Sequence, residues 1–557
     1  MDKKYTIGID FGSLSARAVI VDVQNGDPAG VGEAIYEHGI LNTEIGGNRI
    51  LDGMFLQKTK DYRKALQDSV KMALINSGIR SEQVIGIGVD STSTTLVAAD
   101  AAGVPICEKP EFKNHPFAQV LMWKSHATSK EVEDIVEAAK YLNEPFLKYT
   151  GENISDNLAV PKILHLLRNA PEVYEATERY YDLSDWIVRI LTDKDAINDI
   201  SAGGKFFWCP EAGFPGEQFF EKLDPRMRRL AKDKFPAHVL PSWEIAGTLT
   251  EKGAAILGLP AGLPVSPGHN DGMVPLLAVG VNRENRFSMA IGTGVASHIL
   301  SKKYVNMQGI YGLTIGAPFP GYYCYETGLH SFGDTLAWFV ENVCPQQITS
   351  EAHGGKVFDV LNERATALQP GESGLLALNW WNGNRSLLMS GNLSGVILGL
   401  NLKTKPEEIY RALIEAFAFN YRMIIEEFEK NGIPVEEVIA AGGIPMKNRF
   451  IMQLMCDILG KKICVPKSKQ LPAIGSAIFA AVSAGKDLGG YDTSDEAIAA
   501  MSVKQQDIYL PDKDVTGRYG ELYDLYVKLC FAFGKNAESP VKQLLACKKT
   551  AMKDRGI

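Results

Sequence analysis

A strand–turn–strand unit with a glycine-containing turn occurs twice in this sequence, roughly half a chain apart. The first copy spans residues 5–21 and turns at residues 12–13, and the second spans residues 286–300 and turns at residues 292–294. Apolar, β-branched segments on both sides of a glycine turn are typical of a β-hairpin. Because the same unit returns half a chain later, the chain is predicted to contain two related halves.

Each half continues with a helix, a short loop and an apolar strand. In the first half, apolar residues at i, i+3 and i+4 spacing predict a helix over residues 62–73, and residues 84–90 predict a buried strand. In the second half, Thr404 and Glu407 are expected to form a capping box for a long amphipathic helix, which a strand at residues 438–441 follows. Both halves therefore share one order of elements.

The composition fits a large α/β protein. With 557 residues, of which 45% are hydrophobic, the chain is too long for one compact domain. We predict two duplicated α/β domains, residues 1–281 and 282–557, with a central cleft between them and a helical C-terminal tail.

Charge, hydropathy and cysteine usage exclude several classes of protein. Lys and Arg number 58 against 66 Asp and Glu, so the net charge is −8, and no basic block offers a surface for nucleic acid. No apolar stretch is long enough to span a bilayer, and the N-terminus has no apolar export segment, so we expect a cytoplasmic protein without a membrane partner. The eight cysteines are scattered without a CxxC pair, which disfavours structural zinc and disulfides.

The two glycine turns are candidate phosphate sites. Asp10 lies at the end of the first strand, immediately before Phe11, Gly12 and Ser13, so a carboxylate that can hold Mg²⁺ lies close to exposed backbone N–H groups. Alone, this arrangement is as compatible with an ordinary hairpin as with a site. The second turn strengthens the functional interpretation, because two such turns can grip a polyphosphate from opposite sides. Its residues are Gly292, Thr293 and Gly294.

A third glycine motif lies at the end of a strand in the second half. Gly442 and Gly443 precede a helix, with Asn448 nearby, and paired glycines permit the close approach of a flat ring such as adenine. They are also compatible with a tight strand-to-helix connection. The sequence contains neither GxxxxGK[ST] nor GxGxxG, so we expect a nucleotide to bind in another fold.

Asp271 is the candidate catalytic residue. Phosphoryl transfer to a hydroxyl needs a carboxylate that accepts the hydroxyl proton, and glycines at 268 and 272 leave Asp271 accessible. The alternative is a turn aspartate that caps a helix beginning at Gly272. For His269 we expect a packing role and no proton transfer.

Three motifs resemble those of the FGGY carbohydrate kinases, which belong to the actin, hexokinase and heat-shock ATPase superfamily. They are residues 7–13, 268–273 and 441–443, and the resemblance covers the chain from Thr6 to about Ala484. Within that family, several further segments resemble the L-ribulokinases. These are residues 86–92, 123–127, 201–205, 326–334 and 381–385.

The resemblance implies an actin/hexokinase-like (ribonuclease H-like) fold and the phosphorylation of L-ribulose to L-ribulose 5-phosphate in arabinose catabolism. ATP would be the donor and Mg²⁺ its metal, with Asp10 as metal residue and Asp271 as general base. The glycine motifs and Asn448 would bind the nucleotide. Sugar contacts would come from a set of polar and aromatic residues: Lys205, Glu326, Ser93, Trp123 and Lys124.

Other interpretations stay open. Ser93, Ser125 and the residue after Arg385 depart from the ribulokinase pattern, so another ketopentose or polyol, such as D-ribulose or D-xylulose, is an alternative substrate. Different classes are an ATP-driven conformational protein with the same duplicated fold and a sugar-responsive protein without catalysis. The partners expected are a sugar and ATP, and a homo-oligomer is left open.

Overall fold

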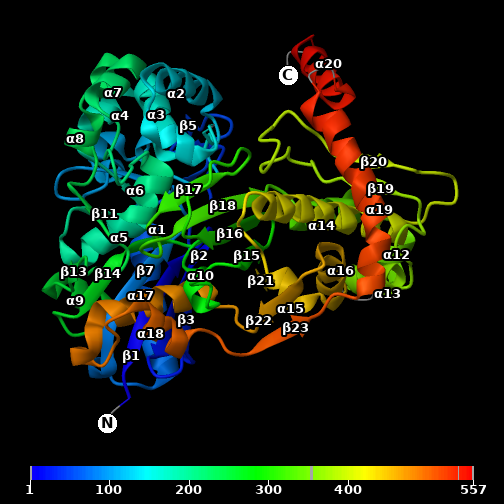
Figure 1. Ribbon diagram of the computed structural model, residues 1–557. Helices are drawn as coiled ribbons and strands as arrows, with labels where there is room; N and C mark the ends of the chain where they lie inside the picture. Colours follow the sequence, from blue (N-terminus) through cyan, green and yellow to red (C-terminus); the bar gives the residue numbers. More distant parts are fainter. Residues whose placement is uncertain (1–2, 153, 352–355, 537–538, 555–557) are drawn as a thin grey trace. The chain divides into compact units, whose positions relative to one another are not determined.

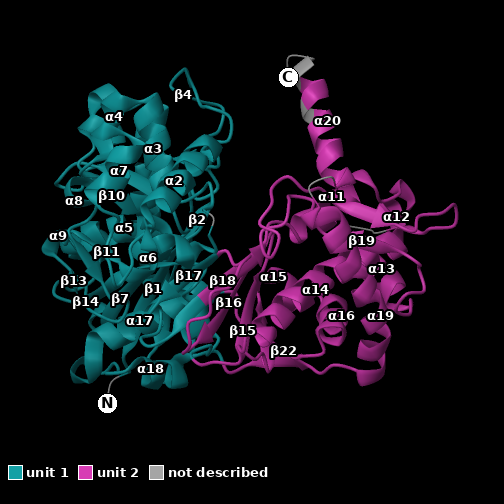
Figure 2. Cartoon of the chain, turned by 45° about the horizontal axis from the view of Figure 1, so that its top comes forward, with its two compact units in different colours: residues 1–282, 312–324, 470–503 teal, residues 283–311, 325–469, 504–557 magenta. Residues whose placement is uncertain are grey.

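The computed structural model describes residues 3–152, 154–351, 356–536 and 539–554 (Figure 1). The chain forms two compact units, which Figure 2 distinguishes by colour. Unit 1 comprises Met1–Asn282, Gly312–Cys324 and Gln470–Val503, and unit 2 comprises Arg283–Tyr311, Tyr325–Lys469 and Lys504–Ile557. The first changeover lies at the predicted domain boundary, but residues 312–324 and 470–503 return to unit 1 instead of continuing in the second domain.

The core of unit 1 is a sheet with the strand order β13-β14-β7-β1-β2-β3. β1 pairs antiparallel with β2 and parallel with β7, and β14 pairs parallel with β7. These strands are β1 (Tyr5–Phe11), β2 (Ser15–Asp22), β3 (Pro28–Ile35), β7 (Val84–Ser91), β13 (Gly247–Thr248) and β14 (Pro264–Asn270). The predicted hairpin over residues 5–21 is confirmed.

Helix α17 (Leu471–Leu488) lies against one face of this sheet because small residues there let its backbone approach. A Cβ atom added at Gly8 of β1 would lie 1.7 Å from the carbonyl oxygen of Ala473, and one added at Gly88 of β7 would lie 2.0 Å from that of Ser476. No other residue fits at either position without moving the helix. This contact explains why a segment from the last fifth of the chain belongs to unit 1.

The opposite face of the sheet packs on α1 (Thr59–Ser77) and α5 (Leu183–Thr192). Side chains alternate between faces along a strand, so Ile7, Ile9 and Val89 lie opposite the glycines and enter a buried cluster with Leu66 of α1 and Trp186 of α5. The sheet is therefore covered on both faces, as in other α/β proteins. Further helices of unit 1 are α2 (Ser129–Leu142), α3 (Ala159–Asn169), α6 (Asp199–Phe206), α8 (Leu230–Lys234), α9 (Glu251–Leu257) and α18 (Ser494–Met501).

The sheet of unit 2 repeats this topology. β15 pairs antiparallel with β16 and parallel with β21, and β21 pairs parallel with β22, so these strands correspond to β1, β2, β7 and β14. The order β18-β16-β15-β21-β22-β23 matches that of unit 1 over the shared strands. The predicted duplication is confirmed. The strands are β15 (Arg286–Ile291), β16 (Val295–Ser301), β18 (Tyr323–Leu329), β21 (Glu437–Ala441), β22 (Lys462–Pro466) and β23 (Gln506–Tyr509).

The long helix of unit 2 begins one residue later than its predicted capping box. Lys405 is the N-cap of α14 (Pro406–Lys430), and the carboxylate of Glu408 accepts its N–H at 2.6 Å. Thr404 instead accepts the N–H of Asn401 at 2.9 Å, so the predicted box of Thr404 and Glu407 is wrong. Other helices are α11 (Gly333–Asn342), α13 (Val357–Thr366), α15 (Gly443–Lys447), α16 (Arg449–Leu459), α19 (Lys513–Cys530) and α20 (Pro540–Asp554).

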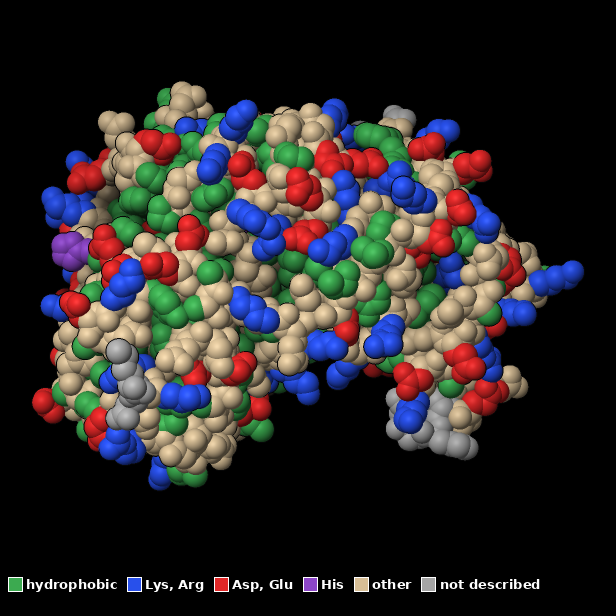
Figure 3. Space-filling view, turned by 60° about the horizontal axis from the view of Figure 1, so that its bottom comes forward, with side chains coloured by type: hydrophobic (Ala, Val, Ile, Leu, Met, Phe, Trp, Pro, Cys, Tyr) green, Lys and Arg blue, Asp and Glu red, His purple; other side chains and the backbone are tan. Residues whose placement is uncertain are grey.

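Charged side chains of both signs are interspersed over the face shown in Figure 3. This face therefore presents a mixed surface and not one continuous basic patch. Within the described residues, every helix is too short or too polar to cross a bilayer.

Candidate active site

Three carboxylates lie at the carboxyl ends of adjacent parallel strands in unit 1. Asp10 of β1 is in register with Asp90 of β7, and Asp90 is in register with His269 of β14, two residues before Asp271. The N–H of Asp271 donates to the carbonyl of Ser91 at 2.9 Å, which holds the β14 terminus beside the end of β7. Ligands of open α/β sheets bind at this edge.

Asp90 is a buried carboxylate that sequence reasoning did not assign to the site. Its Oδ2 accepts the hydroxyl of Ser476 on α17 at 2.6 Å, while its Oδ1 has no hydrogen-bond partner among the described residues. Burial raises the pKa of Asp90 well above its ordinary value, and the neighbouring Asp10 raises it further. Burial also raises the pKa of Asp10. Two carboxylates this close require a shared proton or a cation.

The helix that the sequence allowed Asp271 to cap begins later, at Pro275, and has no side-chain cap. In the turn before it, Asn270 Oδ1 accepts the N–H groups of Gly272 at 2.8 Å and Met273 at 3.2 Å, and the Asp271 carboxyl also interacts with the backbone of Ser93 and Gly272. Burial, followed by the charge of Asp10, raises the pKa of Asp271 to about 7. A carboxylate whose pKa lies near neutrality suits a general base.

His269 has the packing role expected of it. Its ring stacks on Phe479 of α17 with centroids 3.7 Å apart, and burial lowers its pKa to about 3. Neither ring nitrogen has a hydrogen-bond partner among the described residues. His269 is therefore neutral at physiological pH.

Several predicted sugar and phosphate residues are linked by hydrogen bonds within unit 1. The indole N–H of Trp123 donates to Ser13 Oγ at 3.0 Å, and Asn270 Nδ2 donates to Ser93 Oγ at 3.1 Å. Trp123 is 39% exposed, so its packing role is limited. The ammonium of Lys124 instead lies over the ring of Phe55, 4.4 Å from its centroid.

Lys205 occupies the last turn of α6 and is only 5% exposed. Lysine is rarely buried in this way without a structural or functional reason. A Cβ atom added at Gly204, the residue before it, would lie 3.5 Å from the side chain of Thr314, within the segment that returns to unit 1. Lys205 therefore belongs to the interior of unit 1 and not to its solvated surface.

The second glycine turn belongs to unit 2 and joins β15 to β16. The N–H of Gly292 donates to the carbonyl of Gly294 at 3.0 Å, and the Thr293 carbonyl accepts the N–H of Phe332 at 2.9 Å. Thr293 is exposed. The two turns thus occupy equivalent places between the first two strands of each duplicated sheet.

The third motif follows β21. Gly442 has φ +115° and ψ −179°, and a Cβ there would lie 2.3 Å from the carbonyl oxygen of Ile291, so this position requires glycine. Gly443 has open space where a Cβ would stand. The Asn448 side chain caps α16, accepting the N–H of Ile451 at 3.0 Å and donating to Asn362 at 3.1 Å. Its expected nucleotide contact stays a prediction.

Glu326 on β18 is paired within unit 2. Arg385 donates to its carboxylate at 2.9 Å, and the Arg385 guanidinium lies 3.4 Å from the centroid of the Tyr311 ring. Both charged side chains are largely buried. Arg385 was noted in the sequence only as part of a segment, and its position across from Glu326 was not predicted.

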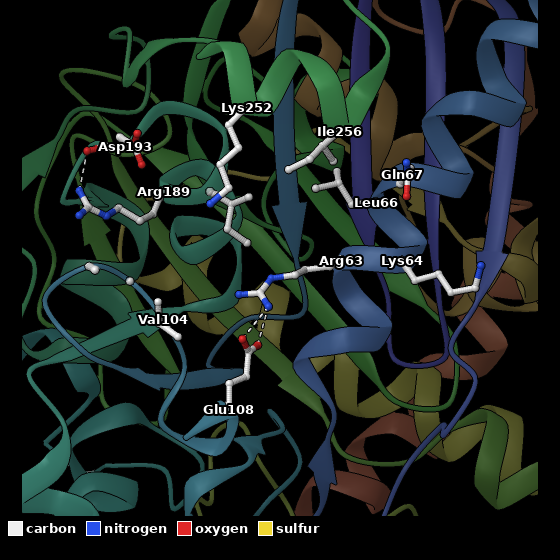
Figure 4. A pocket seen from close by; sticks show the side chains of 13 residues that line it. Arg63, Lys64, Leu66, Gln67, Val104, Glu108, Arg189, Asp193, Lys252 and Ile256 are labelled. Atoms are coloured by element: carbon white, nitrogen blue, oxygen red, sulfur yellow. Dashed lines mark hydrogen bonds and ion pairs between the residues drawn. The ribbon is translucent and has the colours of Figure 1, made fainter. Parts of the chain in front are cut away.

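A separate pocket of about 510 Å³ lies among α1, α5 and α9 of unit 1 (Figure 4). Arg63 is paired there with Glu108 at 2.6 and 2.8 Å, and Arg189 donates to the backbone carbonyl of Asp193 at 2.5 Å. None of the residues that line this pocket is a predicted site residue. The two arginine side chains of this pocket therefore already have partners within the protein.

Comparisons with known proteins identify the family of the chain. The N-terminal domain of the FGGY family of carbohydrate kinases matches residues 5–278, and the C-terminal domain of that family matches residues 287–484. Ribulokinases from Halalkalibacterium halodurans and Geobacillus thermodenitrificans are both 39% identical to the chain. The alignments cover 98% and 99% of this chain, respectively, and 98% of each relative.

Solved structures share the fold at lower identity. A xylulose kinase from Rhodospirillum rubrum matches with a TM-score of 0.75 at 20% identity, covering 95% of this chain and 98% of that one. A gluconate kinase from Lactobacillus acidophilus matches with a TM-score of 0.78 at 18% identity, covering 96% and 99%. Together with the two family models, these similarities confirm the resemblance noted in the sequence. The chain belongs to the FGGY family of carbohydrate kinases and is an ATP-dependent sugar kinase.

Proposed function

We propose that the protein transfers the γ-phosphoryl group of ATP to L-ribulose and forms L-ribulose 5-phosphate in arabinose catabolism. The proposed phosphoryl transfer rests on the carboxylate of Asp271, which lies at the carboxyl end of β14 and whose pKa burial raises to about 7. The choice of sugar is supported by ribulokinases that are 39% identical over nearly the whole chain.

In the proposed reaction, the Asp271 carboxylate accepts the proton of the sugar 5-hydroxyl. As this proton leaves, the hydroxyl oxygen bonds to the γ-phosphorus and the bond between that phosphorus and the bridging oxygen of ADP breaks. We assign phosphate binding to the turns at residues 12–13 and 292–294, through N–H groups other than those of Gly12 and Gly292, which donate to the carbonyls of Ser15 and Gly294. We assign the adenosine to the space beside Gly442 and Gly443.

Mg²⁺ is proposed as the metal, with Asp10 as its residue. Fit is indicated by Asp10 and Asp90, two buried carboxyl groups that lie in register on neighbouring strands and interact with each other, so that a proton or a cation must stand between them. A donor set made only of oxygens suits Mg²⁺, which usually keeps several waters and a few carboxylate contacts. When bound, the ion would neutralise charge on the phosphates.

The substrate is tested by ADP release over a panel of ketopentoses, hexoses and polyols. We expect the highest kcat/KM with L-ribulose, because a buried polar site rejects a sugar that leaves its groups unpaired. A higher value with D-ribulose, D-xylulose or glycerol would overturn the choice of sugar and leave the kinase intact. ADP release that no sugar in the panel stimulates would instead count against sugar phosphorylation itself.

Lys205 and Glu326 are proposed to contact the sugar. Lys205→Ala should raise KM for L-ribulose by about tenfold or more, because a buried charged donor is lost, and should weaken discrimination among epimers. ATP binding without sugar should change little. Lys140→Ala is a control, since Lys140 is exposed on α2 of the same unit.

For Glu326 the matched control is Glu437, which is also ion-paired on a strand of the unit 2 sheet, with Arg286 at 2.7 Å. Glu326→Gln keeps the size of the side chain but removes the charge that faces Arg385. We expect a higher sugar KM for this variant than for Glu437→Gln. Equal values would remove Glu326 from the sugar site and assign its pairing with Arg385 to stability alone.

A further inference from the structure

Lys162 on α3 is a lysine buried inside unit 1. It is 2% exposed, and its ammonium donates to the carbonyl of Thr94 at 2.7 Å and to that of Met122 at 2.8 Å. These two acceptors belong to segments that are 28 residues apart in sequence. Thr94 follows Ser93, and Met122 precedes Trp123 and Lys124, so both segments carry residues proposed to face the sugar.

Thr94 is held from its other side as well. It has φ +60°, which is uncommon for a β-branched residue, and its N–H donates to Asp182 Oδ2 at 3.2 Å. The same oxygen accepts the hydroxyl of Ser201 at 2.8 Å. Ser201 lies on α6, the helix whose last turn carries Lys205. A third sugar segment is therefore tied to the same buried network.

Burying this ammonium has a cost that simple packing would not require. Desolvation lowers the pKa of Lys162 to about 7, with Asp182 and Asp156 opposing the shift. An apolar side chain of similar length could fill the same volume without that cost, but it could not donate to two backbone carbonyls. The strained Thr94 backbone persists because the surrounding groups fix it.

We propose that Lys162 is a positioning residue for sugar binding, whose ammonium fixes the segments around Ser93 and Trp123 relative to each other and, through Thr94 and Asp182, to α6. This inference rests on the proposed function for the identity of the sugar. It does not require Lys162 to touch the sugar or to transfer a proton.

The experiment compares Lys162→Met with Lys234→Met in the full-length protein. Lys234 is a matched control because its ammonium also donates to two backbone carbonyls of unit 1, those of Tyr174 and Thr177. Neither of these carries a predicted sugar role. Each variant loses one lysine ammonium that donates to two backbone carbonyls. A difference in sugar KM or in hydrogen exchange between the two variants is therefore due to the particular segments that Lys162 contacts.

Two readouts distinguish positioning from general destabilisation. Lys162→Met should raise KM for L-ribulose about tenfold or more, with a smaller change in kcat and little change in ADP affinity without sugar. Hydrogen exchange should accelerate in peptides covering residues 92–97 and 120–126, with peptides of β15 and β21 as internal references. Lys234→Met should show neither effect.

An unchanged sugar KM together with unchanged exchange in residues 92–97 and 120–126 would overturn the proposal, as would effects equal to those of Lys234→Met. If Lys162→Met does not fold, Lys162→Gln is used, whose shorter neutral side chain lacks the reach of the ammonium to both carbonyls, so the same criteria apply. Failure of the wild-type protein to phosphorylate L-ribulose would refute the proposed function instead. The exchange measurement would still decide whether Lys162 ties the two segments.

Discussion

Asp271→Asn is expected to lower kcat with L-ribulose by about 10²–10⁴, the usual contribution of a general base. The amide keeps the size of the carboxylate but cannot accept the hydroxyl proton. Sugar affinity should survive, because Asn270 Oδ1 continues to hold the following turn by accepting the N–H groups of Gly272 and Met273. Steady-state kinetics and calorimetric sugar binding measure the two effects separately.

Although Asp271→Asn should lower kcat, it should raise the free energy of unfolding at alkaline pH. Because burial raises the folded-state pKa of Asp271 to about 7, from an ordinary value of 3.8, the wild-type protein loses stability as pH rises from about 4 through 7. The amide has no such loss. At pH 8, without ligands, Asp271→Asn should therefore be more stable than the parent, on the order of 1–2 kcal/mol, with a smaller difference at pH 5.

Asp457→Asn is the control, since burial also raises the pKa of this carboxylate but it lies on α16 of unit 2. Its kcat should stay near that of the parent. Near-normal turnover in Asp271→Asn would show that another group accepts the proton. If Asp271→Asn lost both turnover and thermal stability at pH 8, the claim that the buried Asp271 carboxylate destabilises the folded protein would be wrong.

Asp10→Ala should change the requirement for Mg²⁺ and ATP and leave sugar binding intact. We expect kcat/KM for MgATP to fall by about 10²–10³, the usual loss when one electrostatic contact to a reacting phosphate is removed. Saturation should need more Mg²⁺, because one of the two strand-end carboxylates is gone. Titrations of Mg²⁺ at fixed ATP and of ATP at fixed free Mg²⁺ measure both changes.

Asp22→Ala provides the comparison for Asp10. Asp22 is buried at the opposite end of the same hairpin and pairs with Lys3 at 3.0 Å, so its loss perturbs the hairpin but not the proposed metal position. Only Asp10→Ala should alter the Mg²⁺ dependence. Identical Mg²⁺ and ATP curves for Asp10→Ala and the parent would reduce Asp10 to a turn residue.

The parts of the fold and site that could be predicted from the sequence are those encoded locally. The hairpins, the buried strand at residues 84–90 and the glycine motifs each combine propensity and turn chemistry within a short window. The duplication followed because the same local pattern occurs twice. Asp10 was identified because it lies at a predicted strand end close to Gly12, and Asp271 because it lies between Gly268 and Gly272. Both stand in motifs that resemble those of a known family.

What could not be predicted depends on register and on contacts between distant segments. Asp90 becomes part of the site only because β7 pairs in register with β1, placing it opposite Asp10. The pairing of Arg385 with Glu326 and the attachment of Lys162 to Thr94 and Met122 likewise join residues far apart in the chain. The glycines at 8 and 88 did carry a signal, since alternate glycines in a strand permit close backbone approach.

The contact between α17 and β1 also has a consequence for how this protein is made. A ribosome releases the first hairpin at the start of synthesis, but the helix that covers its glycine face is encoded at residues 471–488. Unit 1 therefore remains without this cover while the unit 2 segments 283–311 and 325–469 are translated. Long-range closure of this kind slows folding and exposes apolar surface to aggregation, so the nascent N-terminal half depends on protection until its last segment arrives.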